Sequence, residues 1–219
     1  MEESAFDFEK TLCPAGVLTC GVDEAGRGPL AGPVCAAAVI LPENADKIAA
    51  LAGLNDSKKL SEKKRDMLAQ SIKQQAVCWS VAYATVEEIE ELNILNAALL
   101  AMNRAIQALK VVPGFALIDG NCSRSIEIPC KTVVGGDAKC PSIAAASILA
   151  KTSRDAYCRE ELDVRYPQYG FAVHKGYGTK AHYQAVEQYG LCPAHRPGFF
   201  KKYFAAREQS AREAAQKQG

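Results

Sequence analysis

Three short apolar segments of this chain are each followed by a carboxylate, and this pattern constrains the fold more than any other feature. The acids are Asp23 and Glu24 after residues 17–22, Asp119 after residues 115–118, and Asp137 after residues 132–136. Each has a glycine next to it or close by, which allows a ligand to approach the backbone closely. Ligand sites of α/β sheets gather at strand ends, where loops converge. The pattern therefore predicts one site built from acids that are far apart in the sequence.

The predicted elements make this an α/β fold with a mixed central sheet flanked by helices. Residues 17–23 and 34–41 read as strands, and the short loop between them favours an antiparallel hairpin. Further strands are expected at 77–84, 115–118 and 132–134, and helices from Ser61, over 92–109, 142–166, 179–188 and 201–218. With 219 residues, 48% of them hydrophobic and 23% charged, the chain has the balance of an ordinary globular protein.

Charge is unevenly distributed along the chain. From residue 173 onward there are eight Lys or Arg against three Glu, a net charge of +5, and the remainder carries −4. An acidic face beside a basic one suits a polyanionic ligand. A solvated basic helix at the C-terminus would give the same imbalance, so charge alone does not choose between the two.

The cysteines and the apolar runs bear on the compartment. There are nine cysteines with no CxxC pair, and residues 1–4 are acidic rather than the basic start of a secretory signal. We therefore expect reduced thiols and a cytoplasmic protein. The longest apolar runs, 34–41 and 143–149, are too short to cross a bilayer.

Each acid has an ordinary structural reading beside the functional one. Asp119 precedes Gly-Asn and suits a turn, and Asp137 suits an anchor near a helix start. Asp23 and Glu24 are harder to explain in this way, because adjacent strand residues point to opposite faces and one acid would point inward. Grouped carboxylates repel unless a cation lies among them, and an oxygen-only site prefers Mg²⁺ or Mn²⁺. Four carboxylates suffice for two ions about 3.5–4 Å apart, the arrangement that promotes in-line attack of water on a phosphate diester.

A loop of small residues follows the first pair of acids. Gly26-Arg27-Gly28 resembles the start of a dinucleotide fingerprint, with Asp46 at about 20 residues' distance. The prolines and the apolar strand that follow do not open a helix, so we reject that interpretation. The loop instead suits backbone amides and a guanidinium pressed against a phosphate or sugar.

A second candidate contact region lies near the end of the chain. Residues 174–182 interleave basic side chains, glycines and Tyr177, so the tyrosine could stack on a base or sugar while Lys175 and Lys180 bind phosphates. The alternative is a loop that enters a helix at Thr179. Lys58 lies in a polar segment that is either a surface turn or a phosphate contact. The spacing of Cys192 and the histidine three residues later is only half of a zinc motif, and we predict no metal there.

Taken together, these motifs resemble bacterial ribonuclease HII, a type 2 ribonuclease H. The matching segments, in the family's order, are residues 21–34, 56–60, 119–121, 136–137 with 143–151, and 166–167 through 174–179. The resemblance covers about residues 17–200. It implies a ribonuclease H-like catalytic domain over 17–200 that includes its substrate-contacting C-terminal part, with a lead-in over 1–16 and a basic helical extension over 201–219.

The resemblance also implies an activity and its residues. Family members cut the RNA strand of RNA–DNA hybrids and nick duplex DNA 5′ of embedded ribonucleotides, a step of ribonucleotide excision repair, and they leave 3′-hydroxyl and 5′-phosphate ends. By the resemblance, the metal-binding catalytic acids are Asp23, Glu24, Asp119 and Asp137, which hold Mg²⁺ or Mn²⁺, two ions with substrate bound. Gly26, Arg27 and Gly28 read the ribose 2′-hydroxyl, and Tyr177 senses the junction. A monomer is implied.

Two points of the resemblance stay open. Tyr166, Tyr169 and Tyr183 are near Tyr177 in sequence, and Tyr169 is an alternative junction sensor. Family members carry a His-Arg-Arg-Ser-Phe-like segment near the end, where residues 195–199 read His-Arg-Pro-Gly-Phe. Two functions of other classes compete with the nuclease: a non-catalytic nucleic-acid-binding module and a nucleotide-binding oxidoreductase.

Overall fold

The computed structural model describes residues 4–59 and 61–216, except for the side chains of 55–59 and 210–216. The first half comprises α1 (Ala5–Leu12), β1 (Thr19–Ala25), β2 (Val34–Ile40), η1 (Ala45–Lys47), η2 (Ala49–Lys59), α2 (Glu62–Gln75), β3 (Cys78–Ala84), α3 (Val86–Leu92) and α4 (Ile94–Gln107). The second comprises β4 (Phe115–Asp119), β5 (Cys130–Val133), η3 (Gly136–Ala138), α5 (Pro141–Tyr157), η4 (Cys158–Leu162), α6 (Asp163–Arg165), η5 (Pro167–Tyr169), α7 (Phe171–His174), α8 (Lys180–Tyr189) and α9 (Pro197–Gln216).

The strands form one mixed sheet in the order β3-β2-β1-β4-β5. β1 pairs antiparallel with β2, which confirms the predicted hairpin, and parallel with β4. β5 extends the parallel side. β1 and β4 therefore run in the same direction, and the acids near their C-terminal ends lie side by side in the middle of the sheet.

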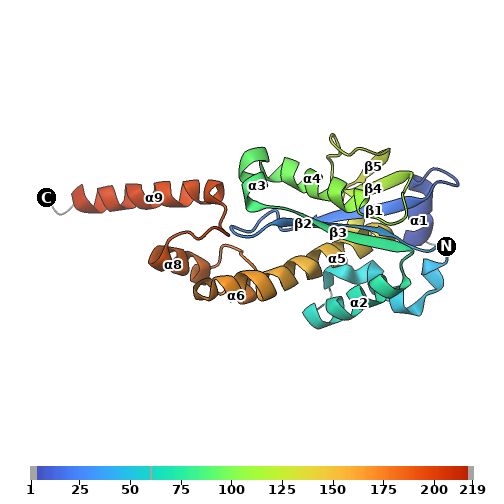
Figure 1. Ribbon diagram of the computed structural model, residues 1–219, viewed down its shortest axis with the longest axis horizontal. Helices are drawn as coiled ribbons and strands as arrows, with labels where there is room; N and C mark the ends of the chain where they lie inside the picture. The colour runs from blue at the N-terminus through green and yellow to red at the C-terminus, as the bar shows by residue number, and fades with distance from the viewer. Residues whose placement is uncertain (1–3, 60, 217–219) are drawn as a thin grey trace.

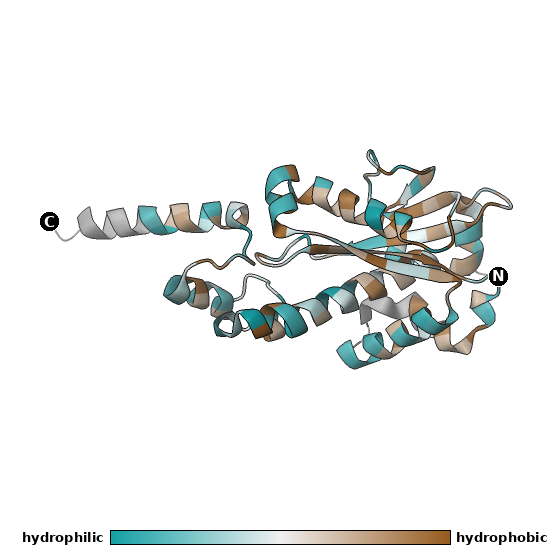
Figure 2. Cartoon of the chain, viewed as in Figure 1, coloured by the Kyte–Doolittle hydropathy of each residue, from teal (hydrophilic) through white to brown (hydrophobic). Residues whose placement is uncertain are grey.

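Helices cover both faces of the sheet, as Figure 1 shows, with α3 and α4 on one side and α2 and α5 on the other. β2 is buried along its whole length. Its residues alternate between a core shared with α4 and a core shared with α2 and α5. Figure 2 shows apolar residues concentrated where the helices face the sheet. Both faces of the strand are covered, which explains its continuous apolar sequence.

The contact between β1 and α5 is especially close because of one glycine. A Cβ on Gly21 would lie 2.2 Å from the carbonyl carbon of Ser142, which no other residue could accommodate without moving the helix. The alanine-rich start of α5 is buried against this strand. Small residues on both elements therefore bring α5 within reach of the acids on β1.

The helix predicted over residues 92–109 is wrong at its start. α3 ends at Leu92, and Asn93, with φ 67°, separates it from α4. The Asn93 side chain accepts hydrogen bonds from the backbone N–H groups of Leu95 and Asn96, which caps α4. Apolar periodicity runs through this break, so the pattern alone does not reveal it.

A separate, aromatic core lies beyond the sheet. Its members are Leu30, Ala31, Cys158, Leu162, Tyr169, Phe171, Val186, Ala194 and Phe200. Leu30 and Ala31 come from the loop after β1, so this loop is built into the C-terminal part of the molecule. α9, expected from Lys201, begins at Pro197 and extends away from the rest (Figure 1). Across the described ranges, no helix has the length and apolarity needed to cross a membrane.

Candidate active site

Asp23 and Glu24 lie near the end of β1, at the centre of the sheet. Asp23 is buried, with 6% of its surface exposed, and its Oδ1 accepts a hydrogen bond of 2.7 Å from the Glu24 backbone N–H. The Glu24 side chain is 12% exposed and pairs with Arg27 at 3.1 Å. The alternation of the strand thus turns one acid inward and the other toward the loop, as expected for adjacent strand residues.

Asp119 lies beside this pair because of the register of β1 and β4. Val22 pairs with Ile118, so the next residue of each strand is an acid. Asp119 Oδ1 accepts a 2.6 Å hydrogen bond from the backbone N–H of Gly136. A Cβ on Gly136 would lie 2.6 Å from Ile143, so the close approach depends on glycine. This bond places Asp137, the next residue, near Asp119.

The electrostatics show that three of these acids affect one another. Burial, and then the negative charges of Glu24 and Asp119, raise the pKa of Asp23 well above its usual range, against a hydrogen bond from Ser147. Burial and the charge of Asp119 also raise the pKa of Glu24, opposed by Arg27. Carboxylates held this close resist joint ionisation, and a cation relieves that cost.

The donor chemistry fits a hard divalent cation, because every candidate ligand is a carboxylate oxygen. Among the side chains that the structure describes, however, no three from His, Cys, Asp or Glu are already gathered closely enough to hold a metal ion. Asp23, Glu24 and Asp119 interact electrostatically, and Asp137 directly follows Gly136, whose N–H binds Asp119.

The loop that follows Asp23 and Glu24 is packed against the protein at Gly26 and exposed to solvent at the next two residues. Gly26 has φ +99°, and a Cβ there would lie 2.1 Å from Arg154 Nε. Arg27 and Gly28 are exposed, the Arg27 side chain by 52%. The loop therefore presents its guanidinium and a glycine backbone outward, next to the carboxylates.

Tyr177 is the tyrosine that lies at this loop. It is 43% exposed, and its Cε1 would be 3.7 Å from a Cβ on Gly28. Tyr169, the alternative from the sequence, is only 4% exposed and donates its hydroxyl to the Gly190 carbonyl. Tyr177 thus has the accessible ring, and Tyr169 belongs to the aromatic core.

A chain of imidazoles supports the backbone of Tyr177. His182 Nδ1 lies 2.9 Å from the Tyr177 carbonyl, so this nitrogen carries the proton and donates it. His195 Nδ1 accepts the Cys192 backbone N–H at 2.9 Å, with a longer 3.3 Å approach to the Cys192 carbonyl. His195 Nε2 therefore carries the proton that it shares with His182 Nε2 at 3.0 Å. Burial lowers the pKa of both histidines to about 4, so both are neutral at pH 7.

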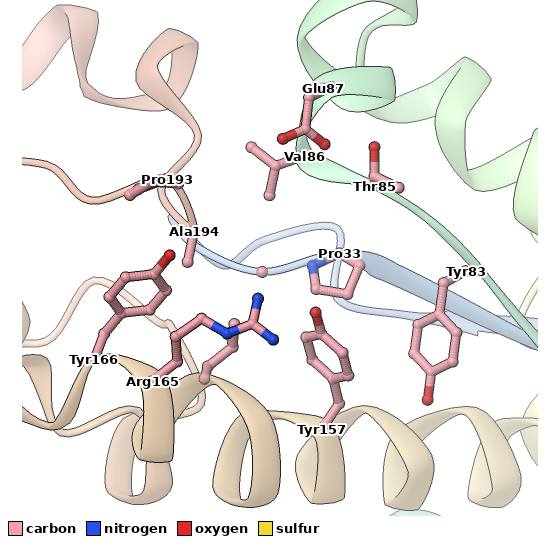
Figure 3. A pocket seen from close by; sticks show the side chains of 12 residues that line it. Pro33, Tyr83, Thr85, Val86, Glu87, Tyr157, Arg165, Tyr166, Pro193 and Ala194 are labelled. Carbon is pink, nitrogen blue, oxygen red and sulfur yellow. The ribbon is translucent and has the colours of Figure 1, made fainter.

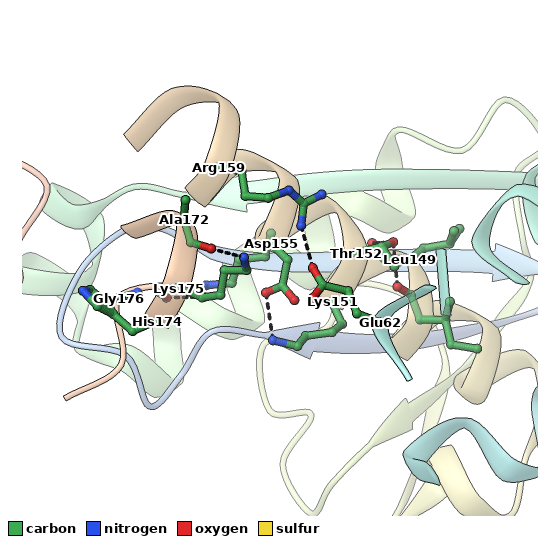
Figure 4. A network of polar contacts seen from close by, with 12 residues as sticks. Glu62, Leu149, Lys151, Thr152, Asp155, Arg159, Ala172, His174, Lys175 and Gly176 are labelled. Atoms are coloured by element: carbon green, nitrogen blue, oxygen red, sulfur yellow. Dashed lines mark hydrogen bonds and ion pairs between the residues drawn. The ribbon is translucent and has the colours of Figure 1, made fainter. Parts of the chain in front are cut away.

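The predicted lysines differ in what they contact. Lys180 is exposed at the start of α8. Lys175 Nζ donates to the Ala172 carbonyl (Figure 4), so its charge is held within its own loop. The side chain of Lys58 lies outside the described residues.

Sequence reasoning missed several side chains that face this site. Lys151 pairs with Asp155 at 2.8 Å (Figure 4), and its Nζ lies 5.7 Å from the centre of the Tyr177 ring. The signal for three of them is their spacing on α5: Ser147, Lys151 and Arg154 follow one another at steps of four and three residues. Residues spaced in this way lie on one face of a helix, so the sequence could have indicated them. Arg196 also contacts the loop, and no spacing in the sequence indicates it.

A separate pocket of about 370 Å³ lies between the end of β3 and α6 (Figure 3). Tyr83, Tyr157, Arg165 and Tyr166 are among the residues that line it. None of the predicted site residues does.

The chain matches known proteins over most of its length. The family model for ribonuclease HII matches residues 20–206. A ribonuclease HII of Dechloromonas aromatica is 58% identical over 188 residues, which are 86% of this chain and 93% of that protein. A ribonuclease HII of Neisseria meningitidis serogroup C is 59% identical over 184 residues, 84% of this chain and 92% of that protein.

A solved structure shows the same architecture. The ribonuclease HII of Archaeoglobus fulgidus, in its complex with PCNA, superposes with a TM-score of 0.70 at 27% identity, covering 82% of this chain and 94% of that one. The sheet, its helices and the family match agree with one another. The chain belongs to the ribonuclease HII family, hydrolases of the ribonuclease H type that cut the RNA strand of RNA–DNA hybrids as endonucleases.

Proposed function

We propose that this enzyme depends on divalent metal ions and nicks duplex DNA on the 5′ side of an embedded ribonucleotide, besides cutting the RNA strand of hybrids. It leaves 3′-hydroxyl and 5′-phosphate ends, as ribonucleotide excision repair requires. The observation that carries this proposal is the direct continuity of Asp23 and Glu24 with an exposed glycine loop against which Tyr177 lies. Groups suited to hydrolysis and groups suited to reading one ribose are thus a few residues apart.

Asp23, Glu24, Asp119 and Asp137 would hold Mg²⁺ or Mn²⁺, two ions when substrate is bound. Such ions activate a water and stabilise the charge that develops on the leaving 3′-oxygen. The mutual repulsion of Asp23, Glu24 and Asp119 supports this assignment. Gly136 holds the Asp119 carboxylate through its N–H and so orients it.

The loop residues Gly26, Arg27 and Gly28 would read the ribose 2′-hydroxyl, the one local group that distinguishes RNA from DNA. The exposed ring of Tyr177 would stack at the junction, beside Lys151, which is paired with Asp155. Lys180 and Lys58 would contact phosphates. For Lys175, the bond to Ala172 supports a role in the shape of the loop.

The remaining assignments concern the whole molecule. We infer a catalytic unit over residues 17–200 with a lead-in over 1–16 and a basic extension over 201–219. A monomer is sufficient, because one chain supplies both the acids and the loop. All nine cysteines are free thiols, which supports a location in the cytoplasm.

The test is to map the cut. The protein is incubated with Mg²⁺ or Mn²⁺ and a duplex that holds one ribonucleotide, with an all-DNA duplex and a chelator as controls. We expect a single nick 5′ of the ribonucleotide, with a 3′-hydroxyl end, that the chelator abolishes. Salt-sensitive binding without any nick would favour the non-catalytic nucleic-acid-binding module instead.

A further inference from the structure

Two arginines, Arg154 on α5 and Arg196 just before α9, are the largest fully buried side chains of the described molecule. Arg154 is 1% exposed and Arg196 is 0% exposed. Guanidinium groups are rarely buried completely unless each donor finds an acceptor. What these two bind is therefore informative.

Arg196 donates only to backbone carbonyls of the loop after β1. Its Nε binds the carbonyl of Gly32 at 2.9 Å, and its Nη2 binds that of Gly26 at 2.8 Å. Its Nη1 binds the carbonyls of Pro29 at 2.8 Å and Arg27 at 3.2 Å. One side chain, far away in the sequence, thus binds both ends of the loop after β1, which begins with the predicted ribose-reading residues Gly26, Arg27 and Gly28.

Arg154 completes the same arrangement from the other side. Its Nε binds the carbonyl of Pro33 at 3.1 Å, and its Nη2 binds that of Ala31 at 3.0 Å. Its Nη1 binds the carbonyl of Lys175 at 3.0 Å, in the loop that carries Tyr177. With the Leu30 carbonyl bound by the Arg196 backbone N–H at 2.8 Å, every carbonyl from Pro29 to Pro33 accepts from one of the two arginines.

The two loops are also joined directly. Leu30 donates its N–H to the Gly176 carbonyl at 2.8 Å, and a Cβ on Gly176 would lie 2.6 Å from the Ala31 carbonyl oxygen. The ribose-reading loop and the Tyr177 loop therefore form one packed unit, with the arginines inside it.

The charges of this unit are compensated by carbonyl dipoles of the two loops. Among the described residues, neither guanidinium makes an ion pair with a carboxylate. Burial, and then the charge of Arg154, lower the pKa of Arg196 to about 9, so it stays protonated at pH 7. Two positive charges thus lie beneath the loop, solvated by its carbonyl oxygens.

This arrangement determines what the loop offers to a ligand. With the carbonyls of Gly26 and Arg27 turned inward, the outer surface at Arg27 and Gly28 is exposed. In the described chain, the backbone N–H groups of Arg27 and Gly28 donate no hydrogen bond to a backbone carbonyl. Free N–H groups above buried positive charge suit an anion or a hydroxyl oxygen.

We propose that Arg196 and Arg154 are positioning residues, which fix the backbone of residues 26–33 in the form that recognises a ribose at an RNA–DNA junction. They touch no substrate and act through the loop carbonyls. This inference rests on the proposed function, because it assigns the support of the loop that reads the substrate.

The test compares R196K and R154K with the wild type. Lysine keeps the charge but lacks the planar fork of donors that binds several carbonyls at once. Dissociation constants are measured without divalent ions for a duplex with one ribonucleotide and for an all-DNA duplex. We expect the preference for the ribonucleotide duplex to fall roughly tenfold in R196K, with all-DNA binding almost unchanged.

A matched control is R104K. Arg104 also donates to several acceptors, the Glu88 carboxylate and the Tyr83 carbonyl, and touches neither loop. It should lower thermal stability and leave the substrate preference intact. If R196K and R154K both retain the wild-type preference, the proposal is overturned.

Hydrogen exchange provides a readout that needs neither substrate nor a variant. In the wild type, the amides of Leu30 and Gly32 should be protected about as well as those of β1, because both are hydrogen-bonded in a preformed loop. Free exchange at these amides would overturn the proposal even if neither variant folds. A different result would separate the two proposals. If the amides are protected in the wild type and exposed in R196K, the structural role of the arginines stands. If that same wild type binds the ribonucleotide duplex no better than the all-DNA duplex, the proposed function fails.

Discussion

The carboxylates and the loop beside them are neighbours in sequence, yet they are held in place in different ways. Asp23 and Asp119 lie on paired strands, so the register of β1 and β4 is sufficient to bring them together. The loop from Gly26 to Pro33 depends on Arg154 and Arg196, more than 100 residues away. The proposed catalytic acids are thus fixed by the sheet, and the proposed recognition loop by side chains from later in the chain.

This difference means that catalysis and recognition are separable by substitution. Changes in the sheet should remove cleavage or the fold, whereas changes in the loop after β1 or in the two arginines that bind it should alter which substrate is bound.

Asp119→Asn should abolish cleavage while the protein stays folded. The amide is the same size and can still accept the Gly136 N–H, but it loses the negative charge that a divalent ion needs. We expect turnover at saturating Mg²⁺ to fall about 10³-fold, the equivalent of roughly 4 kcal/mol. Single-turnover cleavage of a one-ribonucleotide duplex measures this.

The control for Asp119→Asn is substrate binding without divalent ions. It should stay within a few-fold of the wild type, since the loop and Tyr177 are untouched. Turnover close to that of the wild type would refute the assignment of Asp119 to the catalytic acids.

Two glycine substitutions compare the sheet with the loop directly. In Gly21→Ala the new methyl would lie 2.2 Å from the backbone of Ser142, which cannot move alone, so the free energy of unfolding should fall by about 3 kcal/mol or more. In Gly26→Ala it would meet the Arg154 side chain at 2.1 Å, and φ is +99°. That change should cost about 1–3 kcal/mol and weaken ribonucleotide preference. Urea denaturation and duplex binding measure the two effects.

Gly28→Ala is the matched control for both glycine substitutions. Its methyl would have only an ordinary 3.7 Å contact with Tyr177, so stability should hardly change. Equal loss of stability in all three variants would mean that the close contacts at Gly21 and Gly26 do not matter.

The sequence predicts the acid cluster better than it predicts the loop, for a physical reason. Strand ends with acids and glycines are local patterns, and the parallel pairing of β1 and β4 brings Asp23 and Asp119 side by side. The hydrogen bonds of Arg196 join a side chain to backbone carbonyls far away in the sequence. No periodic pattern of residues predicts such bonds. The motif resemblance contained Lys151 and Ser147 but did not assign them a role, because their effect depends on how α5 lies on β1.

The same limit explains the error at Asn93. Apolar spacing continues from α3 into α4 because both helices pack on one side of the sheet. The break is decided by a single residue with positive φ whose side chain caps the second helix. The spacing of apolar residues predicts which face of a helical segment is buried. It does not show whether that segment is one helix or two helices separated by a turn.

The paired imidazoles beneath Tyr177 predict an acid-sensitive fold. The pKa of His182 and His195 is lowered to about 4 in the folded state, against 6.5 in the unfolded one. The unfolded state therefore binds more protons in this window, and stability falls as the pH drops from about 6.5 toward 4. For one such group the loss is on the order of 3 kcal/mol by pH 4. Urea denaturation at pH 7, 5.5 and 4.5 measures the change.

The variant H182N/H195N isolates the histidine contribution to this pH dependence. The raised pKa values of Asp23 and Glu24 favour the folded state at acid pH, so they oppose the histidines in the wild type and persist in the variant. The difference in unfolding free energy between the two proteins should shrink as the pH falls. A difference that is constant from pH 7 to 4.5 contradicts neutral, buried imidazoles.

The smallest expected effect is that of a phosphate contact at the surface. Lys180→Ala should weaken binding of all duplexes a few-fold and equally, and should reduce the slope of log affinity against log salt by about 1. Arg27→Ala should act differently, lowering the preference for a ribonucleotide junction more than general affinity, because Arg27 belongs to the loop proposed to read the ribose. Lys175→Ala should leave the salt slope unchanged, since its Nζ is already bound to the Ala172 carbonyl.

Salt titrations of all three variants on the one-ribonucleotide duplex and on the all-DNA duplex would show whether surface charge and loop geometry act separately. An equal change of slope for Lys175 and Lys180 would mean that both lysines face phosphate and that the bond to Ala172 breaks on binding.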